Sequence, residues 1–259
     1  MKSIQPQAVS TLSGFTGPGR APRRPEPIGP SSTVSRRAVI ASALVYVAAW
    51  LAGLAVLPTG VDPHAGPAEV STVLADNATA AVIQSWLVHG VAAIALLCLV
   101  GSALRMLAAG PHVRIGSTVT WLAAVGAAAA SVLQVALLHA AVAAATATTR
   151  DVAAAFFRAV NVTDMIKLVL LGTVVGGLTI MLARAGAPRW FGWLALSLAG
   201  LLPLAGLAFV SEAPVLGGML AASLVLLLGW ALVAAVFTVR LSEPADGSAA
   251  VVESKREKR

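Results

Sequence analysis

The sequence predicts an all-α protein that crosses a membrane six times. Hydrophobic residues make up 58% of its 259 residues and charged residues only 11%, which is too little charge to cover the surface of a soluble domain. Six apolar runs are each long enough to cross a hydrocarbon layer of roughly 30 Å, which takes about 20 residues of α-helix. The runs are continuous rather than alternating, and this favours helices over strands.

The six spans follow one another along the chain and are flanked by two polar tails. We expect the spans near residues 37–57, 80–107, 117–145, 164–184, 190–211 and 216–239. Residues 1–36 are rich in proline and arginine, and residues 241–259 are charged, so both segments are predicted to be disordered. The twin arginines in SRRAVIA also occur in export signals, but no clear cleavage motif follows them. We therefore expect the first span to be retained.

Polar residues and turn formers set the boundaries of the spans. The first span follows Arg37 and ends before a long acidic connection, residues 58–79. The short stretch 110–116, bounded by glycines, separates the second and third spans. The fourth is expected to follow a short helix at the headgroup level, RDVAAAFFRAV, and to begin where Asn161 or Thr163 can cap it. GAPR and SEAPVLGG form the last two turns.

The basic residues predict the orientation of the chain. Fifteen of the 18 Lys and Arg fall on the side of the two termini, against Arg150 and Arg158 on the other side. The positive-inside rule therefore predicts that both termini lie in the cytoplasm. A composition rich in Ala, Gly, Val and Arg is typical of GC-rich bacteria, which points to the bacterial plasma membrane, with the lipid bilayer as the main partner. The chain offers no folded basic domain for nucleic acid.

Two spans carry the same pair of polar residues. QSWLVHG places Gln84 and His89 five positions apart, and QVALLHA places Gln134 and His139 at the same spacing. Because the second and third spans run antiparallel, His89 is expected near the depth of Gln134, and Gln84 near that of His139. A five-residue step turns an α-helix by about 140°. The two members of each pair are therefore expected to point in different directions, which argues against one compact site.

The other polar residues of the spans lie in the same, outer half of the predicted membrane. NVTDMIK places Asp164 in the first turn of the fourth span and Lys167 three positions later, on the same face. This pair is expected either to reach the outer surface or to join a pocket. The candidate pocket comprises Gln84, His89, Gln134, His139, Asp164, Lys167 and Glu212, which closes the fifth span.

Small residues mark a packing face on the fourth span. Gly172 and Gly176 form a G-x-x-x-G motif, which lets two helices approach closely. In a chain so rich in Ala and Gly, a seam inside the monomer is favoured over a dimer contact.

Three interpretations of the histidines are open. They can form hydrogen bonds between helices, line a ligand pocket or proton-handling site open to the outside, or act as axial haem ligands, His89 with His139. The single cysteine, Cys98, excludes an intrachain disulfide and a cysteine-based metal cluster. Nucleotide-binding, zinc-protease and serine-hydrolase motifs are absent. No cofactor is predicted, with haem as the alternative.

The segment from AVNVTDMIK to LAGLAFV, together with QSWLVHG, resembles small six-helix integral membrane proteins of actinobacteria that have no assigned activity. The resemblance extends over residues 37–240. It implies a six-helix plasma-membrane protein and carries no functional residues to this chain.

The sequence favours a non-enzymatic membrane protein that binds a small ligand, an ion or a partner from the outer face. One alternative is an intramembrane enzyme, such as a cyclase with Asp164 or Glu212 as a buried acid, or a bis-histidine redox subunit. Another is a structural accessory subunit bound to a membrane protein partner. Whether the chain is an enzyme is left open, with a binding protein preferred.

Overall fold

The computed structural model describes residues 31–57, 61–107 and 113–242, and the regular structure in these ranges is helical. Six helical segments are long and apolar enough to cross a membrane, and they match the six predicted spans. The predicted all-α fold with six candidate membrane helices is thus confirmed. The two predicted tails lie outside the described residues, except for 31–36, which belong to the first helix, and 241–242, where the last helix ends.

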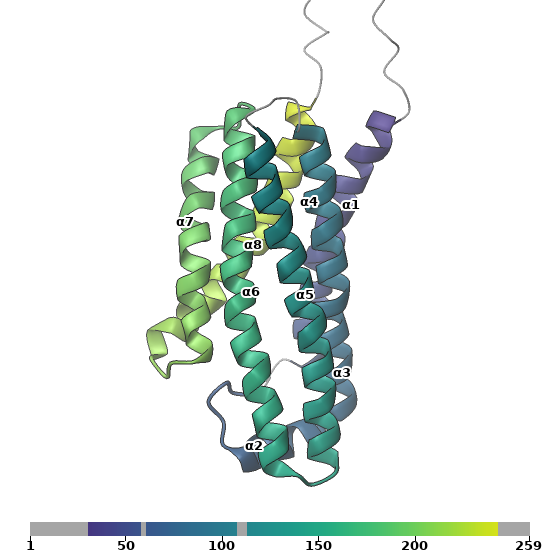
Figure 1. Cartoon of the computed structure of the whole chain (residues 1–259), viewed down its shortest axis with the longest axis vertical. Helices are drawn as coiled ribbons and strands as arrows, with labels where there is room; N and C mark the ends of the chain where they lie inside the picture. The colour runs from purple at the N-terminus through teal and green to yellow at the C-terminus, as the bar shows by residue number, and fades with distance from the viewer. Residues whose placement is uncertain (1–30, 58–60, 108–112, 243–259) are drawn as a thin grey trace, which may run out of the picture.

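The helices form an antiparallel bundle (Figure 1). Their bounds in chain order are α1 (Ser31–Val56), α2 (Pro67–Asp76), α3 (Ala78–Ser85), the π-helical turn η1 (Trp86–Val91), α4 (Ala92–Leu107), α5 (Val113–Thr146), α6 (Arg150–Arg184), α7 (Arg189–Gly206), the 3-10 turn η2 (Leu207–Phe209) and α8 (Pro214–Leu241). Together α3, η1 and α4 make the second span, while α7 and η2 make the fifth. The longest helices, α5 and α6, pack side by side, and α7 packs on α6.

Arginines mark one end of the bundle. α1 begins and α8 ends there (Figure 1), and the helix ends carry Arg105, Arg184, Arg189 and Arg240. We call this the basic end. The opposite end holds α2 and the connection between α5 and α6, and we call it the α2 end.

α2 is a helix that the sequence analysis did not predict, because it lies in the acidic connection 58–79. Pro67 occupies its first position, where the missing N–H would have no partner in the helix anyway, and Glu69 lies in its first turn. Val70 and Leu74 are each 1% exposed and join a small core cluster with residues of α5 and α6. The α2 end is therefore closed by an amphipathic helix rather than by an irregular loop.

The fourth span is longer than predicted, because the expected interfacial helix and the span are one continuous helix, α6. Asn161 and Thr163 lie inside this helix and do not cap it, so that prediction was wrong. RDVAAAFFRAVNVTDMIK contains neither Gly nor Pro, and nothing in it stops the helix. The Thr163 hydroxyl donates to the Ala159 carbonyl one turn earlier, which satisfies it within the helix.

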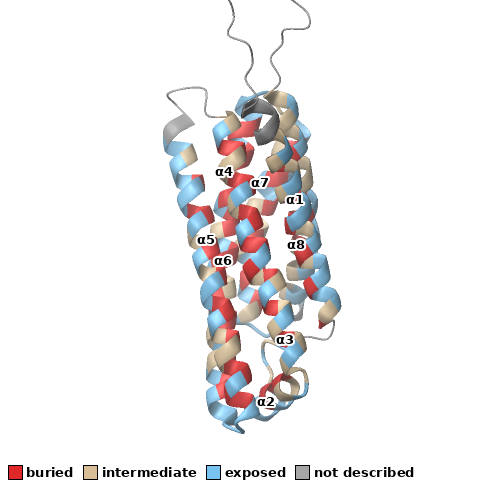
Figure 2. Ribbon diagram, turned by 90° about the vertical axis from the view of Figure 1, so that its right-hand side faces the viewer, coloured by how far each residue is buried: buried red, intermediate tan, exposed pale blue. Residues whose placement is uncertain are grey.

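The exterior of the bundle is apolar as well as the interior. Buried residues from α1, α4, α5, α6, α7 and α8 form the main core cluster, and Figure 2 shows them along the inward-facing sides of the helices. Large aliphatic residues nevertheless remain exposed on the outside, including Ile94 at 67%, Val132 at 65% and Val225 at 71%. Such a surface suits a hydrocarbon solvent, in which helices satisfy their own backbone groups.

The G-x-x-x-G motif is a seam inside the monomer, as the sequence favoured. A Cβ added to Gly172 would lie 2.7 Å from the carbonyl oxygen of Ala199 on α7, while one added to Gly176 would lie 3.5 Å from the Ala199 Cβ. Pro203 has no N–H to offer to that carbonyl, which lies four residues earlier in the helix. Gly172 therefore lets the α6 backbone pack directly against the carbonyl that the proline leaves free.

We expect Gly172→Ala to destabilise the protein by about 1–3 kcal/mol, because the methyl group meets backbone that cannot move aside. The matched control is Gly176→Ala, whose methyl would make an ordinary contact and should change stability little. Unfolding of both variants by SDS in mixed micelles measures the difference. Equal effects of the two substitutions would contradict this account of the seam.

Candidate functional site

The ammonium group of Lys167 lies buried in the middle of α6, where its residue is 4% exposed. Its Nζ pairs with Oδ1 of Asp164 at 2.5 Å, donates to Oε1 of Gln134 at 2.8 Å and lies 3.1 Å from Nδ1 of His89. The ring of Trp50 adds a cation–π contact, with its centroid 5.8 Å from Nζ. All three donors of the ammonium therefore have partners.

These partners come from three separate parts of the bundle. Asp164 lies one turn before Lys167 on α6, Gln134 lies on α5, and His89 lies in η1. Gln134 is fully buried, while Asp164 keeps a side-chain exposure of 16%. The four residues form one hydrogen-bonded group, which we call the lysine cluster.

A positively charged Lys167 fixes the tautomer of His89. An ammonium has no acceptor, so Nδ1 of His89 must accept the hydrogen bond and the ring proton must lie on Nε2. Nε2 makes no hydrogen bond with the described part of the chain. His89 thus supplies a donor that is free for another molecule.

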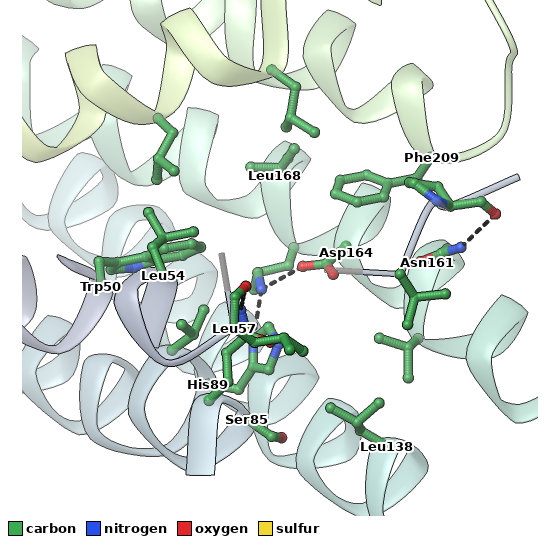
Figure 3. A pocket seen from close by; sticks show the side chains of 18 of the residues that line it. Trp50, Leu54, Leu57, Ser85, His89, Leu138, Asn161, Asp164, Leu168 and Phe209 are labelled. Carbon is green, nitrogen blue, oxygen red and sulfur yellow. Dashed lines mark hydrogen bonds and ion pairs between the residues drawn. The ribbon is translucent and has the colours of Figure 1, made fainter. Parts of the chain in front are cut away.

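Beside the lysine cluster lies a cavity of about 410 Å³, within the range of small-molecule binding sites. Residues of α1, α3, η1, α6 and α8 contribute most of its wall. Figure 3 shows Asp164 and His89 between Trp50 and Leu54 on one side and Phe209 and Asn161 on the other. The wall is mostly apolar, and its polar members are Gln84, Ser85, His89, Asn161, Asp164, Lys167 and Ser223. Its composition is that of a site for a largely apolar molecule.

Ser85 is the clearest unpaired group of this wall. The residue is 1% exposed, and its hydroxyl has no hydrogen-bond partner in the described structure. A buried hydroxyl without a partner costs about 1–3 kcal/mol. Its position on the cavity wall gives a bound molecule a way to offset that cost.

Part of the connection after α1 borders the cavity. Asn161 donates through Nδ2 to the carbonyl of Pro63 at 3.1 Å, and the His64 ring Nε2 lies 3.0 Å from the carbonyl of Ala208. Val61 and Pro63 belong to the cavity wall. The connection is therefore held to α6 and to η2, and it shares the cavity wall at this end with Leu74 of α2.

The π-helical turn changes what the Q-x4-H spacing means on the second span. In a π turn the hydrogen bonds run from residue i to residue i+5, which places more residues in each turn. Five residues therefore end nearer to one full turn than in an α-helix, where they end about 140° past it. Gln84 and His89 both line the cavity. Ala81, Ser85 and Val88, which lie between them around the helix, line it too, so the two residues lie at opposite edges of one helix face, and that they point apart stays a prediction.

The same spacing on α5 behaves as predicted, because α5 is a regular helix there. Gln134 faces the lysine cluster. His139 lies outside the cavity wall, with its Nδ1 2.7 Å from the carbonyl of Val135 and its ring edge-on to Trp86 at 6.1 Å. The expected shared depth of His89 and Gln134 is confirmed by their common partner, Lys167.

Four of the seven predicted pocket residues meet in the lysine cluster, namely His89, Gln134, Asp164 and Lys167. Gln84 lines the cavity and donates weakly to the Leu57 carbonyl at 3.5 Å. The structure does not bring His139 or Glu212 to this site. Glu212 is exposed in the turn between η2 and α8.

The described residues do not form the bis-histidine haem site that the sequence left open. His139 does not share the cavity that His89 lines, so the two histidines are not facing ligands. Within the described residues, no group of three or more His, Cys, Asp or Glu side chains is placed to hold a metal ion.

Several residues of the site were not singled out in the sequence. Trp50 reads as an interface anchor near the end of a span, Asn161 as a helix cap, and Ser85 as a small residue in an apolar run. His64 lies in the acidic connection, outside the predicted spans. These residues are far apart in the sequence, and only the packing of the helices brings them to one site.

Comparison of the chain with protein-family models, with curated proteins and with solved structures found no match. The resemblance to actinobacterial membrane proteins therefore stays a prediction, and the function must be argued from the geometry of the site.

We expect Lys167→Met to destabilise the protein by about 3–5 kcal/mol, because it leaves the Asp164 carboxylate without its cation in a buried position. Removing both charges with Lys167→Met and Asp164→Leu should cost less than Lys167→Met alone. SDS unfolding of the two single variants and the double variant gives this double-mutant cycle. Arg158→Met, an exposed arginine on the same helix, is the control and should stay within about 0.5 kcal/mol of the parent protein. Additive effects of the two charge removals would show that the pair is not coupled.

Proposed function

We propose that the chain is a non-enzymatic integral membrane protein that binds a small amphiphilic molecule in the cavity beside the lysine cluster. The observation that carries this proposal is the cavity of about 410 Å³, with apolar walls around a fixed group of polar side chains. Binding sites for small molecules have this composition, in which a few placed polar groups set the orientation of the ligand.

The charges of the wall favour a ligand without net charge. The carboxylate of Asp164 neutralises the ammonium of Lys167, so the site offers no unbalanced cation to an anionic headgroup. Donors of the wall without a partner in the described structure include Nε2–H of His89, the hydroxyl of Ser85 and the indole N–H of Trp50. These groups suit a carbonyl, ester or hydroxyl oxygen on a molecule whose remainder is hydrocarbon.

A purely structural role would explain the hydrogen bonds of the lysine cluster but not the cavity beside it. Hydrogen bonds among α5, α6 and η1 do stabilise the bundle. They do not require an adjoining cavity, and empty volume itself destabilises a protein, by about 24 cal/mol per Å³ in a well-studied soluble case. A ligand that fills the cavity removes this cost.

The orientation and the membrane are part of the proposal. The basic end carries Arg105, Arg184, Arg189 and Arg240, and the positive-inside rule assigns such an end to the cytoplasm. In a bacterial plasma membrane the termini then lie inside, and the cavity lies in the outer half of the bilayer. The ligand would come from the outer leaflet or from the external medium.

Gly217 offers a direct test of ligand binding, because it lines the cavity and an added Cβ would meet open space. We expect Gly217→Leu to fill part of the cavity and to lower photolabelling of the protein by a diazirine-bearing long-chain alcohol by roughly tenfold, equivalent to about 1.4 kcal/mol of binding.

The matched control is Gly218→Leu, because Gly218 is the next residue, is equally open and does not line the cavity. It should label like the parent protein. Labelled peptides should include residues of the cavity wall on α3 and α6. Labelling that is spread over the lipid-facing surface and unchanged in Gly217→Leu would overturn the proposal.

The proposed orientation predicts the outcome of reporter fusions. A periplasmic reporter such as alkaline phosphatase should be active after Gly60, between the first two spans, and inactive after Lys255. A fluorescent reporter that works only in the cytoplasm should give the reverse pattern. Activity of the periplasmic reporter at Lys255 would contradict the orientation and place the cavity in the inner half of the membrane.

A further inference from the structure

A second, smaller cavity of about 190 Å³ lies between α7 and α8. Its wall includes Trp190, Leu194 and Leu198 from α7 and Val225, Gly229 and Val233 from α8. Every lining residue is apolar or glycine. It shares none of its residues with the larger cavity beside the lysine cluster. It is therefore a separate feature of the fold, which we call the α7–α8 groove.

The α7–α8 groove opens sideways, on the outer surface of the bundle. Trp190 is 58% exposed, Leu194 51% and Val225 71%. Gly229 is also exposed, and nothing lies within 4 Å of a Cβ added to it. In a bilayer this face meets hydrocarbon chains, so the groove is accessible to a lipid from the side.

Two arginines lie where the groove reaches the basic end. Arg189 directly precedes Trp190, which lines the groove. Arg240 lies about one turn beyond Phe237 on α8, and the Phe237 ring contacts Trp190 at a centroid distance of 6.2 Å. Antiparallel packing of α7 and α8 thus brings both guanidinium groups to the same end of the groove.

Both arginines are exposed, and neither forms an ion pair or a side-chain hydrogen bond with the described part of the chain. Lys167 differs from them, because its charge is balanced by an ion pair with Asp164. A guanidinium group binds phosphate oxygens through paired hydrogen bonds. The end of the groove therefore offers uncompensated positive charge at the depth of the lipid headgroups.

We infer that the α7–α8 groove binds an anionic phospholipid, with its phosphate at Arg189 and Arg240 and one acyl chain in the groove. Basic sites between membrane helices on the side that carries the arginines recognise anionic headgroups in this way. Trp190 lies between the charged and the apolar parts, where an indole ring suits the membrane interface. A helix of a partner protein, about 10 Å wide, fits this narrow volume less well than a single acyl chain.

Native mass spectrometry of the full chain in detergent tests the headgroup. The probes are dioleoyl phosphatidylglycerol and dioleoyl phosphatidylcholine, which differ in charge and share their acyl chains. We expect the anionic lipid to bind roughly tenfold more tightly, and the variant Arg189→Gln with Arg240→Gln to lose most of this preference. Both arginines are exposed, so their replacement should leave the fold intact.

A control of equal charge change is Arg150→Gln with Arg158→Gln, at the α2 end of the bundle. These exposed arginines should have no effect on the preference. If both double variants lower it equally, the preference comes from net charge and the inferred site is wrong. Equal binding of the two lipids by the parent protein would also overturn it.

The acyl chain is tested independently of the arginines. Gly229→Leu places a side chain in the groove and should weaken binding of both lipids at this site by roughly tenfold. Gly200→Leu on α7 is the control, because its Cβ also meets open space and Gly200 does not line the groove. Unchanged binding in Gly229→Leu would show that the groove holds no chain.

Discussion

The structure depends on how the charge of Lys167 is held inside a bundle that has almost no other buried charge. An ionised amine taken out of water is costly unless its charge and its donors are matched. Asp164 supplies the charge and Gln134 and His89 supply acceptors. Because these acceptors lie on α5 and in η1, matching the ammonium fixes three segments relative to one another.

One of the three segments that hold the lysine, η1, departs from regular α-helical geometry. η1 is a π turn that contains His89, and both His89 and Gln84 line the cavity. π turns recur at functional sites, since their poorer packing needs a compensating gain. Here the gain is a histidine that accepts from Lys167 through one nitrogen and presents the other as a donor.

Hydropathy alone predicted the six spans, because continuous apolar runs of this length have few alternatives to membrane helices. It could not predict α2, whose apolar face is short and set in an acidic connection, nor the continuity of α6 through Asn161 and Thr163. Local propensity favoured a cap at Asn161, but its amide is instead used in a tertiary contact with Pro63.

Hydropathy also predicted part of the candidate site. Polar residues in apolar spans are few, so His89, Gln134, Asp164 and Lys167 were visible in the sequence. His139 and Glu212 are also polar, ionisable residues and were predicted for the same reason, but neither lines the cavity. Their positions depend on the rotation of α5 and on where α7 ends, and hydropathy does not determine either to within one turn.

The two cavities differ in whether the neighbouring cations are paired. Beside the larger cavity the lysine charge is neutralised by Asp164 on the same helix. At the end of the α7–α8 groove, Arg189 and Arg240 have no acidic partner among the described residues. Apolar walls of this kind hold hydrocarbon without distinguishing headgroups, because apolar contact is non-directional. Headgroup choice must then come from the polar and charged groups at the edge of each cavity, and this is why we propose an uncharged amphiphile for the larger cavity and an anionic lipid for the α7–α8 groove.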